Sequence, residues 1–235
     1  MKSRLISTRK LPHRRIWSKS GRSKSPIYLR LHHRMKPLHP GPLVSHPERL
    51  TYKCSENYVM NNQSLWLACI DKESDVNGTG RRCVIWTQGC SLHCAGCFNP
   101  GLHVFHKGAA YNPKSLAQWL AGLENNGVTI SGGEPLDQNA AVYQFIRTYR
   151  NFCNHTVFLF TGYSLEEIKR SPKRLRTVLA TDAVLCGRYR PGPKWSNKQL
   201  LLITNRISAD DLKPVNDIEL SISDGVVFMT GYPNL

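Results

Sequence analysis

The sequence is poor in acidic residues, and the shortage is uneven along the chain. Its 235 residues include 16 Asp or Glu against 32 Lys or Arg, a net charge of +16. The first 60 residues hold 14 of those basic residues and two of the acids, a net charge of +12, which leaves +4 for the rest. The basicity therefore belongs to one end of the chain, and the remainder does not have the charge of a nucleic-acid-binding fold.

The first 60 residues also lack apolar periodicity and long apolar runs. They are rich in Arg, Lys, His, Ser and Pro, and such a segment cannot bury enough apolar surface to offset its chain entropy. We predict a disordered basic extension over 1–60 and one domain over 61–235. Without a secretory signal or a membrane span, we expect a cytoplasmic protein with no membrane partner. The extension is interpreted as a solvated leader or extended start, with a transit peptide or a nucleic-acid-binding arm as alternatives.

Three of the eight cysteines stand within eight residues, in the run Cys90-Ser-Leu-His-Cys94-Ala-Gly-Cys97. Three thiolates this close can bind one inorganic core from a single loop. A cubane of four irons bound by three cysteines keeps one iron open to another ligand. A closed structural zinc site would instead need a fourth Cys or His.

The other cysteines are expected to have no chemical role. Without an export signal, a disulfide framework is not expected. Cys69, Cys83 and Cys153 fall in or beside apolar runs and are interpreted as small buried residues. Cys186 follows a predicted strand, but its spacing gives it no partner, so it receives the same interpretation.

Apolar runs of strand length alternate with helical patterns from residue 65 onward. Pro113 begins a predicted helix that ends at Gly127, and Ser164 caps another. Further helices are predicted from the apolar stripes Val142–Tyr149 and Leu175–Leu179. The alternation predicts a parallel sheet with helices outside, in a domain too short for eight βα units. The predicted strands are 65–70, 83–87, 128–130, 157–160, 183–185, 200–204, 218–222 and 226–229.

Distinctive segments follow four of these strands. Ligands of such sheets bind at the carboxyl ends of the strands, so we expect the four loops to converge on one mouth. The segments, in chain order, are Cys90–Cys97, Ser131-Gly132-Gly133-Glu134-Pro135, Thr161-Gly162-Tyr163 and Cys186-Gly187.

The cysteine run and the Gly-Gly-Glu-Pro loop, in this order, resemble the signature of the radical S-adenosylmethionine (SAM) superfamily. The surrounding segments Asn77–Arg81, Trp86–Gly89 and Cys97–Pro100 resemble the short glycyl-radical-enzyme activases, specifically the anaerobic ribonucleotide reductase activating proteins. Gly96 stands where most radical SAM enzymes have an aromatic residue, and the reductase-activating group often has glycine there. The resemblance runs from about Leu65 to the end of the chain.

This resemblance implies a fold, a cofactor set and a reaction. The fold would be α/β, a partial open βα barrel. A 4Fe-4S cluster would be bound by Cys90, Cys94 and Cys97, with no catalytic residue beyond it. SAM would be cleaved there, and a glycyl radical would form on a partner enzyme, most often an anaerobic ribonucleotide reductase. The electron would come from a flavodoxin or ferredoxin-type donor. The SAM-binding residues implied are Gly132, Gly133, Glu134 and Tyr163.

Two segments depart from the activase pattern. Cys186-Gly187-Arg188-Tyr189 stands where the activases usually read Asp-Gly, and Ser196-Asn197-Lys198 replaces Ser-Asn-Gln. Two alternatives therefore stay open. One is a small-molecule radical SAM enzyme similar to 7-carboxy-7-deazaguanine synthase, and the other is a non-catalytic iron–sulfur or zinc module whose tail binds nucleic acid.

Overall fold

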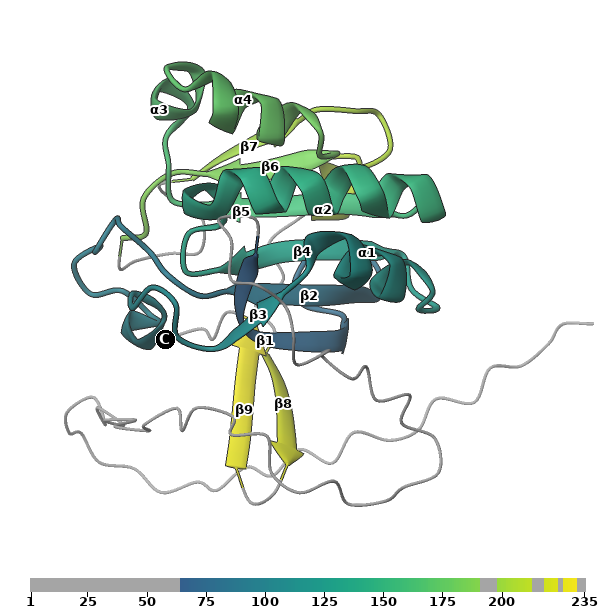
Figure 1. The fold of residues 1–235 in the computed structure, drawn as a ribbon, viewed down its shortest axis with the longest axis horizontal. Helices are drawn as coiled ribbons and strands as arrows, with labels where there is room; N and C mark the ends of the chain where they lie inside the picture. Colours follow the sequence, from purple (N-terminus) through teal and green to yellow (C-terminus); the bar gives the residue numbers. More distant parts are fainter. Residues whose placement is uncertain (1–63, 191–197, 213–217, 224–225, 232–235) are drawn as a thin grey trace, which may run out of the picture. The chain divides into compact units, whose positions relative to one another are not determined.

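The computed structural model describes residues 64–190, 198–212, 218–223 and 226–231 and shows a mixed α/β fold (Figure 1). A seven-stranded sheet has the order β3-β1-β2-β4-β5-β6-β7, and β8 and β9 form a separate two-stranded sheet. The extension expected over 1–60 lies outside the described residues. The strands are β1 (Leu65–Ser74), β2 (Arg82–Thr87), β3 (Ala109–Tyr111), β4 (Gly127–Gly132), β5 (Thr156–Thr161), β6 (Ala183–Cys186), β7 (Gln199–Leu202), β8 (Ile218–Ser223) and β9 (Val226–Gly231).

The centre of the large sheet is parallel and its edges are antiparallel. Strands β2, β4, β5 and β6 are parallel neighbours. On one side β1 pairs antiparallel with β2 and β3 pairs antiparallel with β1, so β3 again runs in the direction of β2; on the other side β7 pairs antiparallel with β6. The eight predicted strands are all present, and β3 was missed because three residues, two of them alanine, carry no apolar period. The prediction of a parallel sheet is therefore right for the four strands that precede the distinctive loops.

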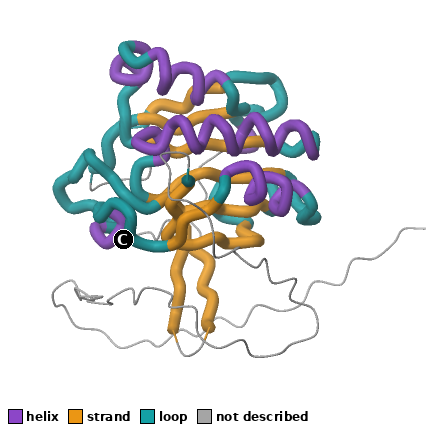
Figure 2. The backbone as a smooth tube through the Cα atoms, viewed as in Figure 1, coloured by secondary structure: helices purple, strands orange, loops and turns teal. Residues whose placement is uncertain are grey.

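The helices pack on one face of this sheet (Figure 2). The predicted apolar stripe of α2 is buried, but Leu179, predicted to pack, has 60% of its surface exposed. Behind the sheet, Ile207 and Leu212 cover Phe158 and Leu185 in a smaller cluster. The helices are α1 (Pro113–Ala121), α2 (Asn139–Phe152), α3 (Leu165–Lys169) and α4 (Pro172–Leu179), with short 3-10 turns η1 (Pro100–Leu102), η2 (Pro135–Gln138) and η3 (Asp210–Leu212).

The helix boundaries follow local capping chemistry. Asn112 accepts hydrogen bonds from the backbone N–H groups of residues 114 and 115 at the start of α1. That helix ends at Ala121 and Gly122 caps it, so the predicted end at Gly127 is wrong. Gly127 instead begins β4, where a Cβ atom would collide with the carbonyl oxygen of Thr156 on the neighbouring strand. The predicted capping box of Ser164 and Glu167 is confirmed at α3.

A buried arginine fixes the amino ends of the parallel strands. Arg82, at the start of β2, has no exposed surface. Its guanidinium donates to the Thr129 hydroxyl at 2.9 Å, the Val128 carbonyl at 3.0 Å, and the Thr156 hydroxyl and carbonyl at 2.9 and 3.1 Å. It also donates to the carbonyl of Thr79. Burial lowers the pKa of Arg82 to about 10, which leaves it charged at neutral pH.

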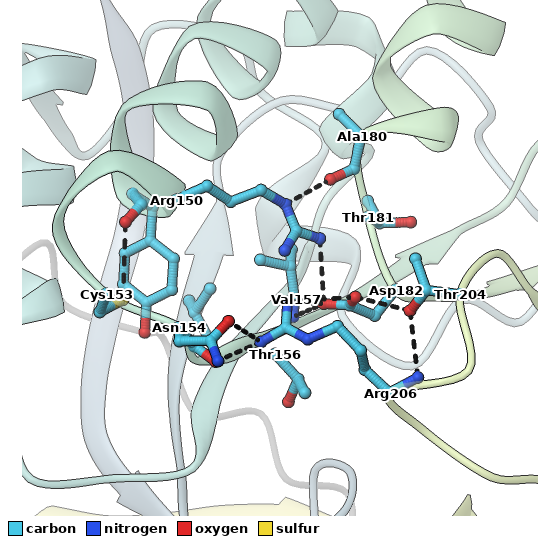
Figure 3. A network of polar contacts seen from close by, with 12 residues as sticks. Arg150, Cys153, Asn154, Thr156, Val157, Ala180, Thr181, Asp182, Thr204 and Arg206 are labelled. Atoms are coloured by element: carbon cyan, nitrogen blue, oxygen red, sulfur yellow. Dashed lines mark hydrogen bonds and ion pairs between the residues drawn. The ribbon is translucent and has the colours of Figure 1, made fainter.

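A buried carboxylate, that of Asp182, holds the amino ends of β5 and β6 together (Figure 3). The side chain of Asp182, just before β6, is fully buried and accepts hydrogen bonds from the Val157 N–H and the Thr204 hydroxyl, both at 2.7 Å. It forms ion pairs with Arg150 at 3.0 Å and Arg206 at 3.4 Å. Val157 lies on β5, so Asp182 joins β5 and β6 to α2 and to the segment after β7. The edge opposite the loops is thus fixed by Arg82 and Asp182.

Candidate functional site

The cysteine loop leaves the carboxyl end of β2 and is fixed at its base. Gly89 donates to the carbonyl of Leu102 at 2.9 Å, and the N–H of Cys90 donates to that of His103 at 3.2 Å. Cys90 is buried, whereas Cys94 and Cys97 are partly exposed, and all three are free thiols. The loop therefore presents three reduced sulfur atoms at the edge of the sheet.

The surroundings of these thiols fit an iron–sulfur cluster better than a zinc ion. In the described part of the chain, no three His, Cys, Asp or Glu side chains gather closely enough to hold one metal ion. A zinc ion would need four ligands converging on one point, whereas a cubane is a larger core whose irons can each take a separate cysteine. The observed donor set, three thiols on one loop, matches the second requirement.

Burial and backbone hydrogen bonds act in opposite directions on two of these thiols. Burial raises the pKa of Cys90 and of Cys97. Backbone N–H groups of Leu92 and His93 at Cys90, and of Asn99 at Cys97, favour the thiolate. N–H groups directed at ligand sulfurs also help to set the reduction potential of a bound cluster. Burial is the larger effect, so the pKa of both thiols is raised and binding them to iron as thiolates releases protons.

The Gly-Gly-Glu-Pro loop, which follows β4, lies directly against the cysteine loop. Gly133 donates to the carbonyl of Thr87 at 2.7 Å, and the N–H of Glu134 donates to that of Gly89 at 2.8 Å. A Cβ atom at Gly132, which has φ +109°, would collide with the Thr87 backbone, and one at Gly133 would collide with the Gly89 carbonyl. The resemblance implies that these two glycines bind SAM; what the structure shows is that they allow the two loops to touch.

Glu134 joins the second loop to the third. Its side chain is fully buried, and Oε1 accepts from the Leu136 N–H at 2.8 Å and the Thr161 hydroxyl at 2.7 Å. Oε2 accepts from the Gly162 N–H at 2.7 Å. Burial raises the pKa of Glu134 to about 7, although these three hydrogen bonds act to lower it. The carboxylate thus fixes the Thr161-Gly162-Tyr163 loop relative to the cysteine loop.

Tyr163 points its hydroxyl towards the cysteine loop. The hydroxyl donates to Asp137 at 2.6 Å and lies 3.3 Å from the Ser91 hydroxyl. The Arg174 guanidinium lies 3.7 Å from the centre of the Tyr163 ring, and that of Arg188 lies 5.4 Å from it. The sequence analysis identified Tyr163 but missed Asp137 and Ser91. The only signal for these two residues was that each lies next to or near a motif, Ser91 after Cys90 and Asp137 after the Gly-Gly-Glu-Pro loop.

The fourth loop, which follows β6, is hydrogen-bonded to the third loop. Gly187 donates to the carbonyls of Thr161 and Tyr163 at 3.1 and 2.9 Å. Arg188 binds both carboxylate oxygens of Glu167 and the carbonyl of Gly162, and Lys198 donates to the carbonyl of Gly187 at 2.8 Å.

The expected convergence of four loops on one mouth is therefore confirmed. Cys186 and Cys83 are buried, as predicted, but Cys69 is exposed and Cys153 only partly buried. Ser196 and Asn197 lie outside the described residues. Within the described residues, no helix has both the length and the apolar character needed to cross a membrane.

Comparison with known proteins agrees with this geometry. Residues 76–206 match the family model described as a 4Fe-4S single cluster domain, which spans the four loops. Three similar proteins are each named anaerobic ribonucleoside-triphosphate reductase-activating protein. The relative from Pasteurella multocida is 30% identical over 122 residues, which are 48% of this chain and 77% of the relative. The relative from Vibrio cholerae is 29% identical over 133 residues (51% and 84%), and that of Enterobacteria phage T4 is 31% identical over 120 residues (48% and 74%).

The matched region contains the three thiols, the Gly-Gly-Glu-Pro loop and the strands that bring them together. The residues present fit the cofactors that this family uses. The chain therefore belongs to the 4Fe-4S single cluster domain family, as an activating enzyme of the radical SAM type whose cofactors are a 4Fe-4S cluster and SAM.

Proposed function

We propose that this enzyme cleaves SAM reductively and generates a glycyl radical on a partner protein, an anaerobic ribonucleotide reductase. The observation that supports this most directly is the hydrogen-bonded contact between the cysteine loop and the Gly-Gly-Glu-Pro loop at one edge of the sheet. The names of the relatives support the choice of partner. When bound, the cluster supplies one electron that breaks a sulfur–carbon bond of SAM and so produces the radical that removes hydrogen from glycine.

The chain's own contribution is to bind and orient. We assign cluster binding to Cys90, Cys94 and Cys97. In this proposal the backbone at Gly132 and Gly133 and the side chain of Tyr163 border the methionine end of SAM. Glu134 is fully buried and already accepts three hydrogen bonds, so its part in SAM binding in this proposal is to fix both loops that border SAM.

A protein substrate fits the fold better than a small molecule does. Small ligands are normally enclosed. The four loops that meet at this edge are already committed to one another, and the edge strand β7, which is antiparallel to its neighbour β6, adds no further βα loop there. We also propose that the sheet corresponds to a partial open βα barrel, that 1–60 is a separate extension of the 61–235 domain, and that a flavodoxin or ferredoxin-type protein is the electron donor.

The decisive experiment is anaerobic reconstitution followed by turnover. The parent chain should hold about four irons and four sulfides, cleave SAM after reduction, and give a glycyl-radical doublet by electron paramagnetic resonance with the host's anaerobic ribonucleotide reductase. Cys90→Ala, Cys94→Ala and Cys97→Ala should each lose the cluster, whereas the matched control Cys186→Ala should retain it. The proposal fails if a small molecule accelerates SAM cleavage while no glycyl radical enzyme of the host gives a doublet. Stoichiometric zinc without iron in protein purified anaerobically from its host would also overturn it.

A further inference from the structure

Asp137 connects the Gly-Gly-Glu-Pro segment to the residue that follows the first cysteine. Its Oδ2 accepts a hydrogen bond from the backbone N–H of Ser91 at 2.7 Å. Its Oδ1 accepts from the Ser91 hydroxyl at 3.1 Å and from the Tyr163 hydroxyl at 2.6 Å. Ser91 directly follows Cys90, so this carboxylate fixes the backbone where the cysteine loop turns away from the sheet.

The position of Asp137 is itself fixed by the fold. The residue lies in η2, where its N–H donates to the carbonyl of Glu134 at 3.1 Å. The next residue, Gln138, donates to the carbonyl of Gln88 at 2.9 Å and exchanges hydrogen bonds of 2.7 and 3.0 Å with the backbone of Trp66. The segment is therefore anchored on both sides, and Asp137 holds the cysteine loop from a rigid support.

The carboxylate also brings a negative charge close to the cysteine loop. The guanidinium groups of Arg174 and Arg188 face the ring of Tyr163, whose hydroxyl binds Asp137. The direct contacts of the carboxylate are with Ser91 and with the Tyr163 hydroxyl. Cluster potentials depend on nearby charge and hydrogen bonding, and a fixed negative charge disfavours the addition of an electron.

We propose that Asp137 is a positioning residue for the cluster: it fixes the cysteine loop through Ser91, and its charge keeps the reduction potential of the bound cluster low. A low potential suits an enzyme whose bound cluster has to reduce SAM. This inference rests on the cluster site of the proposed function, but its mechanical part concerns the chain alone.

The mechanical part is tested on the cluster-free protein by amide hydrogen exchange. Asp137→Ala removes the acceptor of the Ser91 N–H, so exchange in residues 90–93 should be at least tenfold faster than in the parent. Asp211→Ala is the matched control. Asp211, in η3, accepts a hydrogen bond from the backbone N–H of Ser208, as Asp137 does from that of Ser91, but it lies on the other face of the sheet. That control should leave residues 90–93 unchanged. Unchanged exchange in Asp137→Ala would overturn the positioning role.

The electrostatic part is tested on the reconstituted protein by redox titration, followed by electron paramagnetic resonance. Asp137→Asn keeps an acceptor oxygen for Ser91 and removes the charge, so the reduction equilibrium should shift at least tenfold towards the reduced cluster. For a one-electron couple this is 59 mV. Ser91→Ala keeps both the charge and the backbone hydrogen bond, so its potential should match that of the parent.

An unchanged potential in Asp137→Asn, or an equal shift in Ser91→Ala, would overturn the electrostatic role. The two proposals fail in distinguishable ways. A parent chain that binds no cluster refutes the proposed function, while hydrogen exchange of the cluster-free chain still decides whether Asp137 positions the loop.

Discussion

Replacing Asp182 by alanine should cost this protein a large part of its stability without touching the cysteine loop. The change removes the acceptor of two buried donors, the Val157 N–H and the Thr204 hydroxyl, both at 2.7 Å. It also leaves Arg150 and Arg206 without their shared anion. The pairing of β5 with β6 begins beside this carboxylate, so the loss falls on the centre of the sheet.

The size of the effect follows from these contacts. Breaking a buried ion pair from one side typically costs about 3–5 kcal/mol. The side chains of Arg150 and Arg206 are 25% and 27% exposed, so water can solvate them in part and the lower half of that range applies. We therefore expect Asp182→Ala to lower the free energy of unfolding by about 3–4 kcal/mol. Asp182→Asn keeps one acceptor oxygen and loses mainly the charge, so its cost should be about 1–2 kcal/mol.

Urea denaturation of the cluster-free chain under anaerobic conditions measures both values. In thermal unfolding, the melting temperature of Asp182→Ala should fall by roughly 10 °C, because each kcal/mol lowers it by about 2–4 °C in a chain of this size. Asp211→Asn, an exposed aspartate in η3, is the control and should stay within about 0.5 kcal/mol of the parent. If Asp182→Ala stays within about 1 kcal/mol of the parent, or Asp182→Asn loses as much as Asp182→Ala, the account given for this carboxylate is wrong.

Three further predictions concern other parts of the chain. Arg82→Met should lower the free energy of unfolding by about 2–4 kcal/mol, because buried acceptors on β4 and β5 lose their donor. The control Arg81→Met, at the exposed neighbouring arginine, should lower it by less than about 1 kcal/mol. Glu134 has a folded-state pKa of about 7 against 4.5 when unfolded, so the folded chain binds more protons between these values and its stability should fall as pH rises from 4.5 to 7. Glu134→Gln should flatten that slope in urea titrations at several pH values, and parallel profiles would contradict this reasoning. A chain that begins at Met60 should fold and bind the cluster as the full chain does, and loss of soluble protein would show that the extension contributes to the domain.

The sequence predicted the strands well because apolar runs bounded by polar residues need no tertiary information. It was less accurate where one residue type serves two purposes. Gly127 was predicted to end the helix that begins at Pro113. It is instead the first residue of β4, where the neighbouring strand leaves no room for a Cβ atom. Leu179 continues the apolar stripe of α4, yet it stays exposed.

Some residues of the candidate site could be predicted from the sequence and others could not. The cysteines and the Gly-Gly-Glu-Pro loop were found because their spacing is local. Asp137 and Ser91 are 46 positions apart and meet only because β2 and β4 are parallel neighbours. Arg82 and Asp182 carry charges that patterning assigns to the surface, and their burial depends on acceptors and donors contributed by several strands.

The four loops at the mouth are connected in series, each to its neighbour. The cysteine loop binds the Gly-Gly-Glu-Pro segment, Glu134 binds Gly162, and Gly187 binds the carbonyl of Thr161. A second connection joins the third loop to the first directly, because the Tyr163 hydroxyl lies 3.3 Å from the Ser91 hydroxyl. The departure from the activase pattern at Cys186–Arg188 occurs in the last link. A substitution in that loop, natural or designed, therefore acts on the cysteine loop through the position of Tyr163, whose carbonyl binds Gly187 and whose hydroxyl faces Ser91.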